Sequence, residues 1–297
     1  MSYFRLEVFR AVAKRLNFTK AAAELFITQP AVTKHIHELE RYYKVKLFDR
    51  NGSKIKLTAA GETLLQHTEQ IFAIYQNIEF DMSSLTQVRS GKLRIGASTT
   101  VAQYVLPPVL AAFHNKFSNI KIILSVNNTE LIEKALLNNE IDLGIIEGRL
   151  KNRALKYTEF LKDELVLVSA NKNIHFKNEI IQPAQLTKIP LILREPGSGT
   201  LEVIVHSLKA FKIKLRDLNV EMQLSGTESI KSYLLHSDTM AFLSRHSILN
   251  ELQQNRLRII DIKGLKIQRS FYFIQNQGAM DSLPDVFMKF AKHYNFR

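Results

Sequence analysis

Polar side chains suited to reading DNA gather at the start of one predicted helix near the N-terminus. An amide such as Gln29 makes a bidentate contact to adenine, a hydroxyl such as Thr33 bonds a base or touches a thymine methyl, and an amine such as Lys34 reaches guanine or phosphate. The candidate base-reading segment comprises Thr28, Gln29, Pro30, Ala31, Thr33 and Lys34.

Other polar and basic side chains nearby are suited to phosphate or minor-groove contacts, which give affinity and register but little sequence information. These additional candidates are Thr19, His37, Arg41, Arg50, Lys54 and Lys56. The alternative interpretation is a solvated basic helix that contains a hydrogen-bonded histidine pair, His35 and His37.

Hydroxyl groups mark a second kind of site in the remainder of the chain. The segment 97–100 ends a predicted strand and opens a helix, and the segment 194–200 contains two glycines that let the backbone approach a ligand. Free backbone N–H groups at helix starts stabilise anions. The candidate ligand-binding residues are Ser98, Thr99, Thr100, Thr129, Ser198, Gly199, Thr200 and Thr227. Helix capping is the alternative role, above all for the Ser225-x-x-Glu228 spacing.

Catalytic and metal chemistry find little support. The chain has no cysteine, which excludes disulfides, thiolate zinc sites and a cysteine nucleophile. No HExxH, Walker or GxSxG motif occurs, and 197–200 lacks the lysine and the spacing of a P-loop. We therefore expect no enzyme, no metal and no cofactor other than a small-molecule co-inducer.

The elements that must position the DNA readers are short helices and a hairpin. Helical periodicity predicts one helix over 4–16, a second with Thr19 as its N-cap, and a third from Thr28 to about Tyr43 with Pro30 in its first turn. Residues 46–57 read as two strands around an Asn51-Gly52-Ser53 turn, a basic wing. Residues 1–57 hold twelve Lys or Arg against five acids, so +7 of the chain's net +13 lies there.

A long helix is predicted from Thr58 to about Arg89. Alternating steps of four and three residues are typical of a coiled-coil seam, which predicts a dimer helix. The seam residues assigned to dimerisation are Leu64, Ile71, Tyr75, Ile78 and Met82. The alternative is an amphipathic helix that packs on its own domain.

From residue 90 onward, short apolar runs alternate with helical stretches, which indicates an α/β domain with parallel pairing. The predicted strands are 92–97, 120–126, 143–147, 165–170, 191–194, 220–224, 240–243 and 271–274. The sequence thus divides into 1–58, 59–90 and 91–297.

Neither a signal peptide nor an apolar run long enough to span a membrane is found, so we expect a cytoplasmic protein without membrane contact.

The N-terminal sequence resembles the LysR-type transcriptional regulators. The resemblance is carried by 18–22 (FTKAA), 28–36 (TQPAVTKHI), 39–40, 47–50 (LFDR) and 57–61 (LTAAG). It implies a winged helix-turn-helix, a linker helix and an effector domain like periplasmic binding proteins, with one lobe from about 91–162 and 268–297 and the other from 163–267. It further implies dimers or tetramers on promoter DNA, with RNA polymerase as an expected partner.

The segment 194–200 resembles regulators of sulfur-assimilation and carbon-fixation genes, which implies a small anionic metabolite as effector. The segment 238–245 departs from the family pattern, in which glycines precede this strand and a proline follows it.

Other functions fit the sequence less well. A transport protein would need a signal peptide, and a purely architectural DNA binder would not need about 200 further residues. A degenerate pocket that binds nothing stays an alternative.

Overall fold

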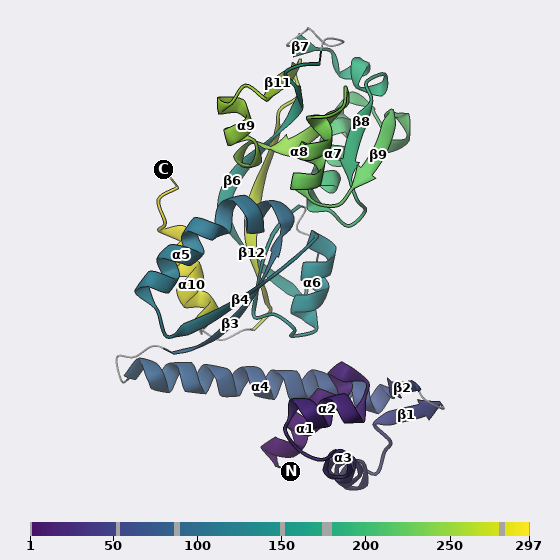
Figure 1. Ribbon diagram of the computed structural model, residues 1–297, viewed down its shortest axis with the longest axis vertical. Coiled ribbons are helices and arrows are strands. Elements are labelled where there is room, and N and C mark those ends of the chain that lie inside the picture. The colour runs from purple at the N-terminus through teal and green to yellow at the C-terminus, as the bar shows by residue number, and fades with distance from the viewer. Residues whose placement is uncertain are drawn as a thin grey trace. The chain divides into compact units, whose positions relative to one another are not determined.

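The computed structural model describes residues 2–51, 54–85, 90–148, 152–173, 180–278 and 283–296. Contacts divide the chain into two compact units, Met1–Glu79 and Phe80–Arg297, and each is described by itself. The elements are labelled in Figure 1.

The first unit is a helix-turn-helix with a β-hairpin. Helices α1 (Tyr3–Arg15), α2 (Phe18–Glu24) and α3 (Gln29–Tyr43) surround an apolar core. The fully buried members of this core include Val8, Phe9, Val12, Val32, Ile36 and Leu39. Phe4 and Leu16, which share the predicted apolar spacing of α1, are more than a third exposed and lie outside this core.

The helix caps differ in part from the prediction. Thr28 caps α3 as expected, since its hydroxyl accepts a hydrogen bond from the Ala31 N–H at 3.4 Å. Thr19 does not cap α2: the cap is Asn17, whose side chain accepts from the Lys20 N–H at 2.9 Å. Both side chains are good N-caps, but Asn17 has the extended backbone that the position requires.

The wing consists of β1 (Phe48–Asn51) and β2 (Lys54–Leu57), which pair antiparallel with Phe48 opposite Leu57. The first strand begins at Phe48 rather than at the expected position 46. The predicted turn residues Gly52 and Ser53 lie outside the described residues.

One buried carboxylate fixes the approach to the wing. Glu40 of α3 accepts hydrogen bonds from the Leu47 N–H at 3.0 Å and from Lys46 Nζ at 3.1 Å. Burial opposes the charge of this group, but these donors outweigh burial and hold the pKa of Glu40 below its ordinary value.

Helix α4 (Ala59–Leu85) begins in the first unit, and its bounds agree with the predicted start near Thr58. Its first turns belong to the core there: Leu64 packs on the three helices, and Glu69, 3% exposed, pairs with Arg10 and Lys14 at 2.8 and 2.9 Å. Beyond Phe72 an apolar row is exposed, with Tyr75, Ile78 and Met82 between 46% and 60% accessible. The predicted end of this helix, 86–89, lies outside the described residues.

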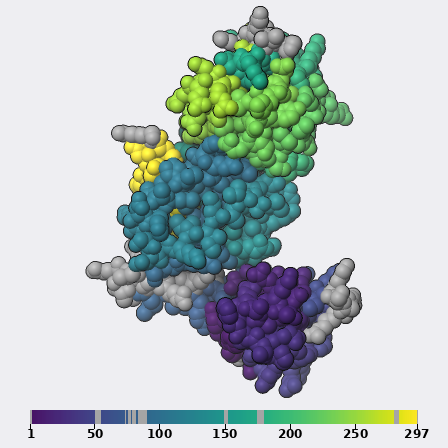
Figure 2. All heavy atoms as spheres, viewed as in Figure 1, coloured from purple at the N-terminus to yellow at the C-terminus, as the bar shows by residue number. Residues whose placement is uncertain are grey.

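The second unit is a two-lobed α/β fold built on one continuous sheet, in the order β4-β3-β5-β12-β6-β10-β8-β9. Lobe I is defined by the core that joins residues 93–145 to 271–291, and lobe II by the core within 165–267. Figure 2 shows the two lobes as distinct masses, with the yellow C-terminal residues against lobe I.

The strands and helices of lobe I alternate. They are β3 (Gly91–Ser98), the π-helical turn η1 (Val101–Val105), α5 (Leu106–Lys116), β4 (Ile120–Asn127), α6 (Thr129–Leu137), β5 (Leu143–Glu147) and, from the end of the chain, α10 (Leu283–Lys292). The pairing of β3 with β4 and β5 is parallel, as the sequence predicted.

Lobe II repeats this alternation. Its elements are β7 (Ile180–Ile181), β8 (Leu191–Arg194), α7 (Gly199–Leu208), β9 (Val220–Leu224), α8 (Thr227–Leu234), β10 (Met240–Ser244), α9 (Leu249–Gln253) and β11 (Leu257–Ile262), with short 3-10 turns at 183–187, 209–211, 215–217 and 245–247.

Two long strands connect the lobes (Figure 1): β6 (Leu155–Ala170) and β12 (Ile267–Asn276) pair antiparallel along most of their length. The sequence predicted only 165–170 and 271–274 of these strands and missed β11 entirely. The missed part of β6 is rich in polar residues and half-exposed between the lobes, so its apolar pattern is weak. These antiparallel pairings make the sheet mixed rather than wholly parallel.

Candidate functional site

The predicted base readers lie on the solvent face of α3. Gln29, Pro30 and Lys34 are exposed, on the opposite side from the buried row of that helix. The candidates for phosphate or minor-groove contacts on the same helix, His37 and Arg41, are exposed as well. Ala31 and Thr33 are half-buried. The Gln29 amide donates to the Thr33 hydroxyl at 3.1 Å, and that hydroxyl in turn donates to the Gln29 carbonyl at 3.1 Å. One face of one helix thus presents an amide, a hydroxyl and an amine together.

The remaining DNA candidates are only partly described. Thr19 is exposed on α2 and Lys56 is exposed on β2. The side chains of Arg50 and Lys54 lie outside the description.

The alternative of a histidine pair with satisfied hydrogen bonds is not met by His35, whose Nδ1 is buried without a hydrogen-bond partner among the described residues. His35 packs edge-on against Phe4 at 5.4 Å, whereas His37 is about half exposed with Nδ1 3.4 Å from Glu40.

The turn before α3 contains a residue that the sequence did not single out. Phe26 is 96% exposed and has a left-handed backbone with φ 55°. A bulky residue in this conformation is unusual. The sequence feature that could have pointed to Phe26 is an aromatic residue in the turn between the two helices of the motif.

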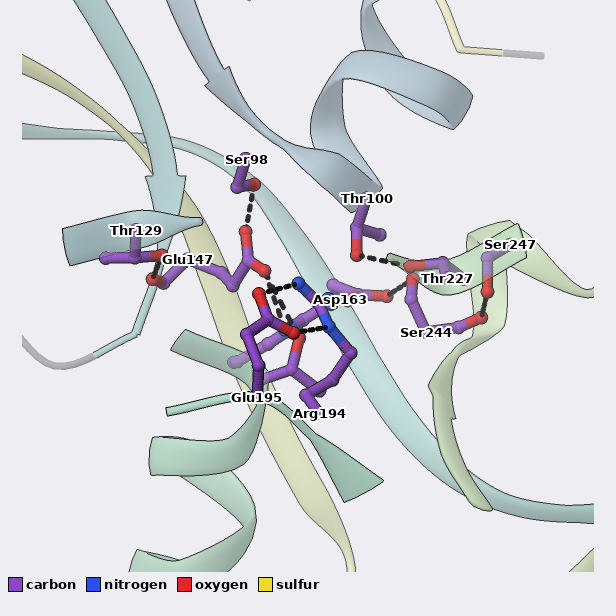
Figure 3. Close-up of polar contacts among 12 residues, drawn as sticks. Ser98, Thr100, Thr129, Glu147, Asp163, Arg194, Glu195, Thr227, Ser244 and Ser247 are labelled. Carbon is purple, nitrogen blue, oxygen red and sulfur yellow. Dashed lines mark hydrogen bonds and ion pairs between the residues drawn. The ribbon is translucent and has the colours of Figure 1, made fainter. Parts of the chain in front are cut away.

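Four of the predicted effector residues, Ser98, Thr100, Thr129 and Thr227, lie near one another between the lobes (Figure 3). Ser98 at the end of β3, Thr129 at the start of α6 and Thr200 in the first turn of α7 are each at most 8% exposed. Thr100 and Thr227 face each other across the lobes, with 3.3 Å between their hydroxyl oxygens. Parallel strands that end at one edge of the sheet account for this convergence.

Glu147, at the end of β5, is the residue on which these groups meet. Its Oε2 accepts a short hydrogen bond from Ser98 and its Oε1 one from Thr200 at 3.2 Å. Its backbone carbonyl accepts from Thr129 Oγ1 at 2.8 Å. A Cβ on Gly199 would lie 2.0 Å from that carbonyl oxygen, so only glycine fits there. Gly199 thus serves the close approach of the two lobes.

A buried guanidinium completes the cluster. Arg269 Nε donates to Asp163 at 2.6 Å, Nη1 donates to the Thr200 hydroxyl at 2.8 Å, and Nη1 lies 3.7 Å from Glu147 Oε1. Ser244 also donates to Asp163, at 2.7 Å. All these side chains are buried.

Sequence reasoning missed Glu147, Asp163 and Arg269. The available signal was a charged residue inside or directly after an apolar strand, as in Leu143–Glu147.

Two of the predicted effector hydroxyls have no hydrogen-bond partner among the described residues. Ser198 occupies the N-cap position of α7, yet its side chain makes no cap hydrogen bond, and its Oγ is buried and unsatisfied. The Thr99 Oγ1 is in the same situation. A cavity of about 500 Å³ borders Ser198 and Gly197 on one side and Thr129 and Glu130 on the other.

The capping alternatives have mixed outcomes. Helix α6 begins at Thr129, and its cap is Asn128, which accepts from the Leu131 N–H at 3.1 Å. The Ser225-x-x-Glu228 capping box does not form, because Gly226 is the N-cap of α8 and no side chain bonds the helix start.

Glu228 instead joins the lobes. Its carboxylate accepts a short hydrogen bond from Tyr104 of η1 and another from Lys231 at 3.1 Å. Burial, together with the bond to Glu228, raises the pKa of Tyr104 far above its ordinary value, so the phenol stays protonated as a donor. At the other rim, the Glu130 N–H donates to the Gly197 carbonyl at 3.2 Å.

Chemistry beyond binding finds no further support in the described residues. Within these ranges, no three His, Asp or Glu side chains are grouped to hold a metal ion. No helix in the described part of the chain is long and apolar enough to cross a membrane.

Sequence comparison matches two family models. The LysR substrate binding domain matches residues 86–295, and the bacterial regulatory helix-turn-helix protein of the lysR family matches residues 4–62.

Three similar proteins cover nearly the whole chain. A "Probable RuBisCO transcriptional regulator" of Trichormus variabilis is 32% identical over 92% of this chain and 82% of its own length. The "HTH-type transcriptional activator CmpR" of Synechocystis sp. is 31% identical over 94% and 90%. The "HTH-type transcriptional regulator CysL" of Bacillus subtilis is 27% identical over 93% and 91%.

Two solved structures have a similar fold. CbnR complexed with its target DNA has a TM-score of 0.68 and 19% identity, covering 99% of this chain and 98% of that one. The Synechocystis CcmR regulatory domain in complex with 2-PG has a TM-score of 0.61 and 27% identity, covering 68% and 95%.

Proposed function

Because the chain belongs to the LysR family of bacterial transcriptional regulators, we propose that the exposed face of α3 reads promoter DNA and that the cleft around Ser98 and Thr200 binds the effector. The chain is a DNA-binding regulator that works as an oligomer and responds to a small molecule, not an enzyme. The expected winged helix-turn-helix with a two-lobed effector domain is confirmed. So is the resemblance to the carbon-fixation and sulfur subgroup.

The observation that carries the DNA assignment is the division of α3 into two faces. Val32, Ile36 and Leu39 are at most 2% exposed, which leaves the opposite row no packing role. In helix-turn-helix proteins the second helix of the motif enters the major groove through its first turns. Gln29 and Lys34 stand in those turns, and CbnR, which shares the fold, was solved on its target DNA.

Lys34→Ala tests this assignment on the full chain. We expect weaker binding to the promoter region beside the gene in gel shifts, with a salt slope smaller by about one unit for a phosphate contact, or relaxed base preference for a guanine contact. The matched control is Lys209→Ala, an exposed lysine of the second unit, which should leave both quantities unchanged. Equal affinity and salt dependence for the two variants would refute the assignment of α3.

For the effector we propose a small anionic metabolite. The support is the buried hydroxyl set at two helix starts and the complex of the similar CcmR domain with 2-PG. Ser98→Ala and Thr200→Ala should abolish effector-dependent changes in DNA binding while basal DNA binding persists. Loss of basal binding as well would indicate misfolding, which circular dichroism of each variant detects.

The domain plan and the partners complete the proposal. We take 1–58 as the DNA-binding domain, 59–90 as the linker that pairs two subunits, and 91–297 as the effector domain with the lobe bounds predicted from the sequence. The exposed row Tyr75, Ile78 and Met82 supports pairing through α4. RNA polymerase is the proposed partner at the promoter, and the cytoplasm is the proposed location.

A further inference from the structure

The hydroxyls predicted to receive an effector anion already hold an anion that belongs to the chain. Ser98 of lobe I and Thr200 of lobe II both donate to the carboxylate of Glu147, which is 1% exposed. A carboxylate, a phosphate and a sulfate all present the same kind of oxygen to such donors. Glu147 therefore occupies a site of the chemistry that the effector needs.

The charges around Glu147 do not balance. Arg269 makes its closest ionic contact with Asp163 at 2.6 Å and lies 3.7 Å from Glu147, so two buried carboxylates share one guanidinium. Arg194 does not help, because Glu195 binds it through two hydrogen bonds of 2.8 and 3.0 Å. An entering oxyanion meets at Glu147 a carboxylate that Arg269 neutralises only in part.

Donors for an oxyanion are nevertheless left over beside this charge. Among the described residues, the Ser198 hydroxyl and the Arg269 Nη2 are buried without a hydrogen-bond partner, although Ser198 is 3% exposed and the Arg269 side chain 2%. Buried donors without partners are rare in proteins because they lose their bonds to water. Ser198 also lines the cavity of about 500 Å³, and its hydroxyl oxygen is buried beneath that surface.

We propose that Glu147 is a resident anion, which holds the place that the carboxylate, phosphate or sulfate group of the effector takes. Binding then requires the Glu147 side chain to leave Ser98 and Thr200, while Ser198 and Arg269 supply further donors to the ligand. Because Ser98 and Thr200 belong to different lobes, the exchange replaces one inter-lobe bridge by another. This inference rests on the proposed function of the cleft.

The test compares Glu147→Gln with the wild type in the full-length protein. The probes are sulfate and inorganic phosphate, titrated by calorimetry and by thermal shift at constant ionic strength. Glutamine keeps the size of the side chain and one acceptor oxygen, replaces the other oxygen by an NH2 donor, and removes the charge. We expect at least about tenfold tighter binding of both probes, the change that loss of a like charge at close range produces.

Three further variants make the test specific. Glu164→Gln removes a carboxylate from the residue that follows Asp163 in β6. Glu164 pairs with Arg245 outside the cluster around Glu147, so this variant should bind the anions like the wild type. Adding Ser198→Ala to Glu147→Gln should remove most of the gain, since it deletes a proposed donor. If Glu147→Gln fails to fold, Glu147→Asp withdraws the carboxylate by one methylene and should show a smaller gain.

Equal or weaker binding by Glu147→Gln would overturn the inference. Absence of binding by every variant at millimolar probe concentrations would overturn it as well. Gel shifts on the same preparations separate this result from the regulator assignment. If all variants bind DNA normally and bind the anions with equal affinity, the inference about Glu147 is wrong and the DNA-binding role of α3 stands. If Glu147→Gln binds the anions more tightly but no preparation binds DNA, the role of α3 is wrong.

Discussion

The DNA-reading face of α3 and the cleft between the lobes are both polar, but they are built in opposite ways. The groups on α3 come from one helix within six positions and are exposed or half-buried. The cleft groups come from the ends of β3 and β5, the start of α7 and the two connecting strands, and nearly all are buried. A site on one helix depends on local spacing, whereas the cleft depends on tertiary contacts. Removing a cation should therefore affect binding in the first region and stability in the second.

Arg269→Met should have the largest effect. It leaves Asp163 and Glu147 buried without a cation, and removing one partner of a buried pair costs about 3–5 kcal/mol. Urea unfolding of the full chain, followed by the far-ultraviolet circular dichroism, measures the loss. The matched change Arg245→Met breaks an exposed pair with Glu164 at 3.2 Å and should cost less than about 1 kcal/mol. Similar losses for the two variants would show that the buried cation of the cleft contributes no more to stability than an exposed one.

Ile78→Glu tests the exposed row of α4, which belongs to neither region. If this row pairs two subunits, the carboxylate is buried at the interface and should weaken the dimer by about 2–3 kcal/mol. Light scattering over a concentration series measures the change. The control is Glu62→Gln in the first turn of the same helix, which should leave the mass unchanged. Dimers of unchanged affinity would place the subunit contact elsewhere.

Glu40 tests whether the DNA-reading unit also depends on a buried charge, and its effect should be the smallest. Its lowered pKa means that the folded unit gains stability above pH 4.5, the ordinary value of glutamate, and loses it as the pH falls through the lowered folded value. Hydrogen-exchange protection of the amides around Leu47, corrected for intrinsic rates, should fall over that range. Glu40→Gln should lower this protection by about 1 kcal/mol at neutral pH and flatten its pH dependence. A wild type that is flat across this range would contradict the role of Glu40.

The sequence predicted the first unit almost completely because its information is local. The caps, the apolar row of α3 and the wing each lie within one short stretch, and the one misplaced cap, Thr19 for Asn17, is an error of two positions. In the effector unit, the strands with strong apolar patterns, such as 143–147 and 191–194, were predicted to the residue.

What the sequence could not supply was the set of partners across the cleft. Ser98 and Thr200 were predicted from their positions at helix starts, and the structure brings them together. The carboxylate between them was not foreseen, because a single glutamate after an apolar strand gives no indication of which loops will surround it. Asp163 and Arg269 are 106 positions apart, and only the pairing of β6 with β12 makes them neighbours.

The double crossing of the chain between the lobes has a consequence for how the protein is made. Phe271, Phe273 and Phe287 complete the core of lobe I, but they follow the whole of lobe II in the chain. Lobe II and the helix-turn-helix contain all the segments of their own cores before residue 270 and can fold while synthesis continues. Lobe I must wait until the segment 271–291 has been synthesised, because that segment supplies part of its core. The effector site, which needs both lobes, therefore forms after the DNA-reading unit.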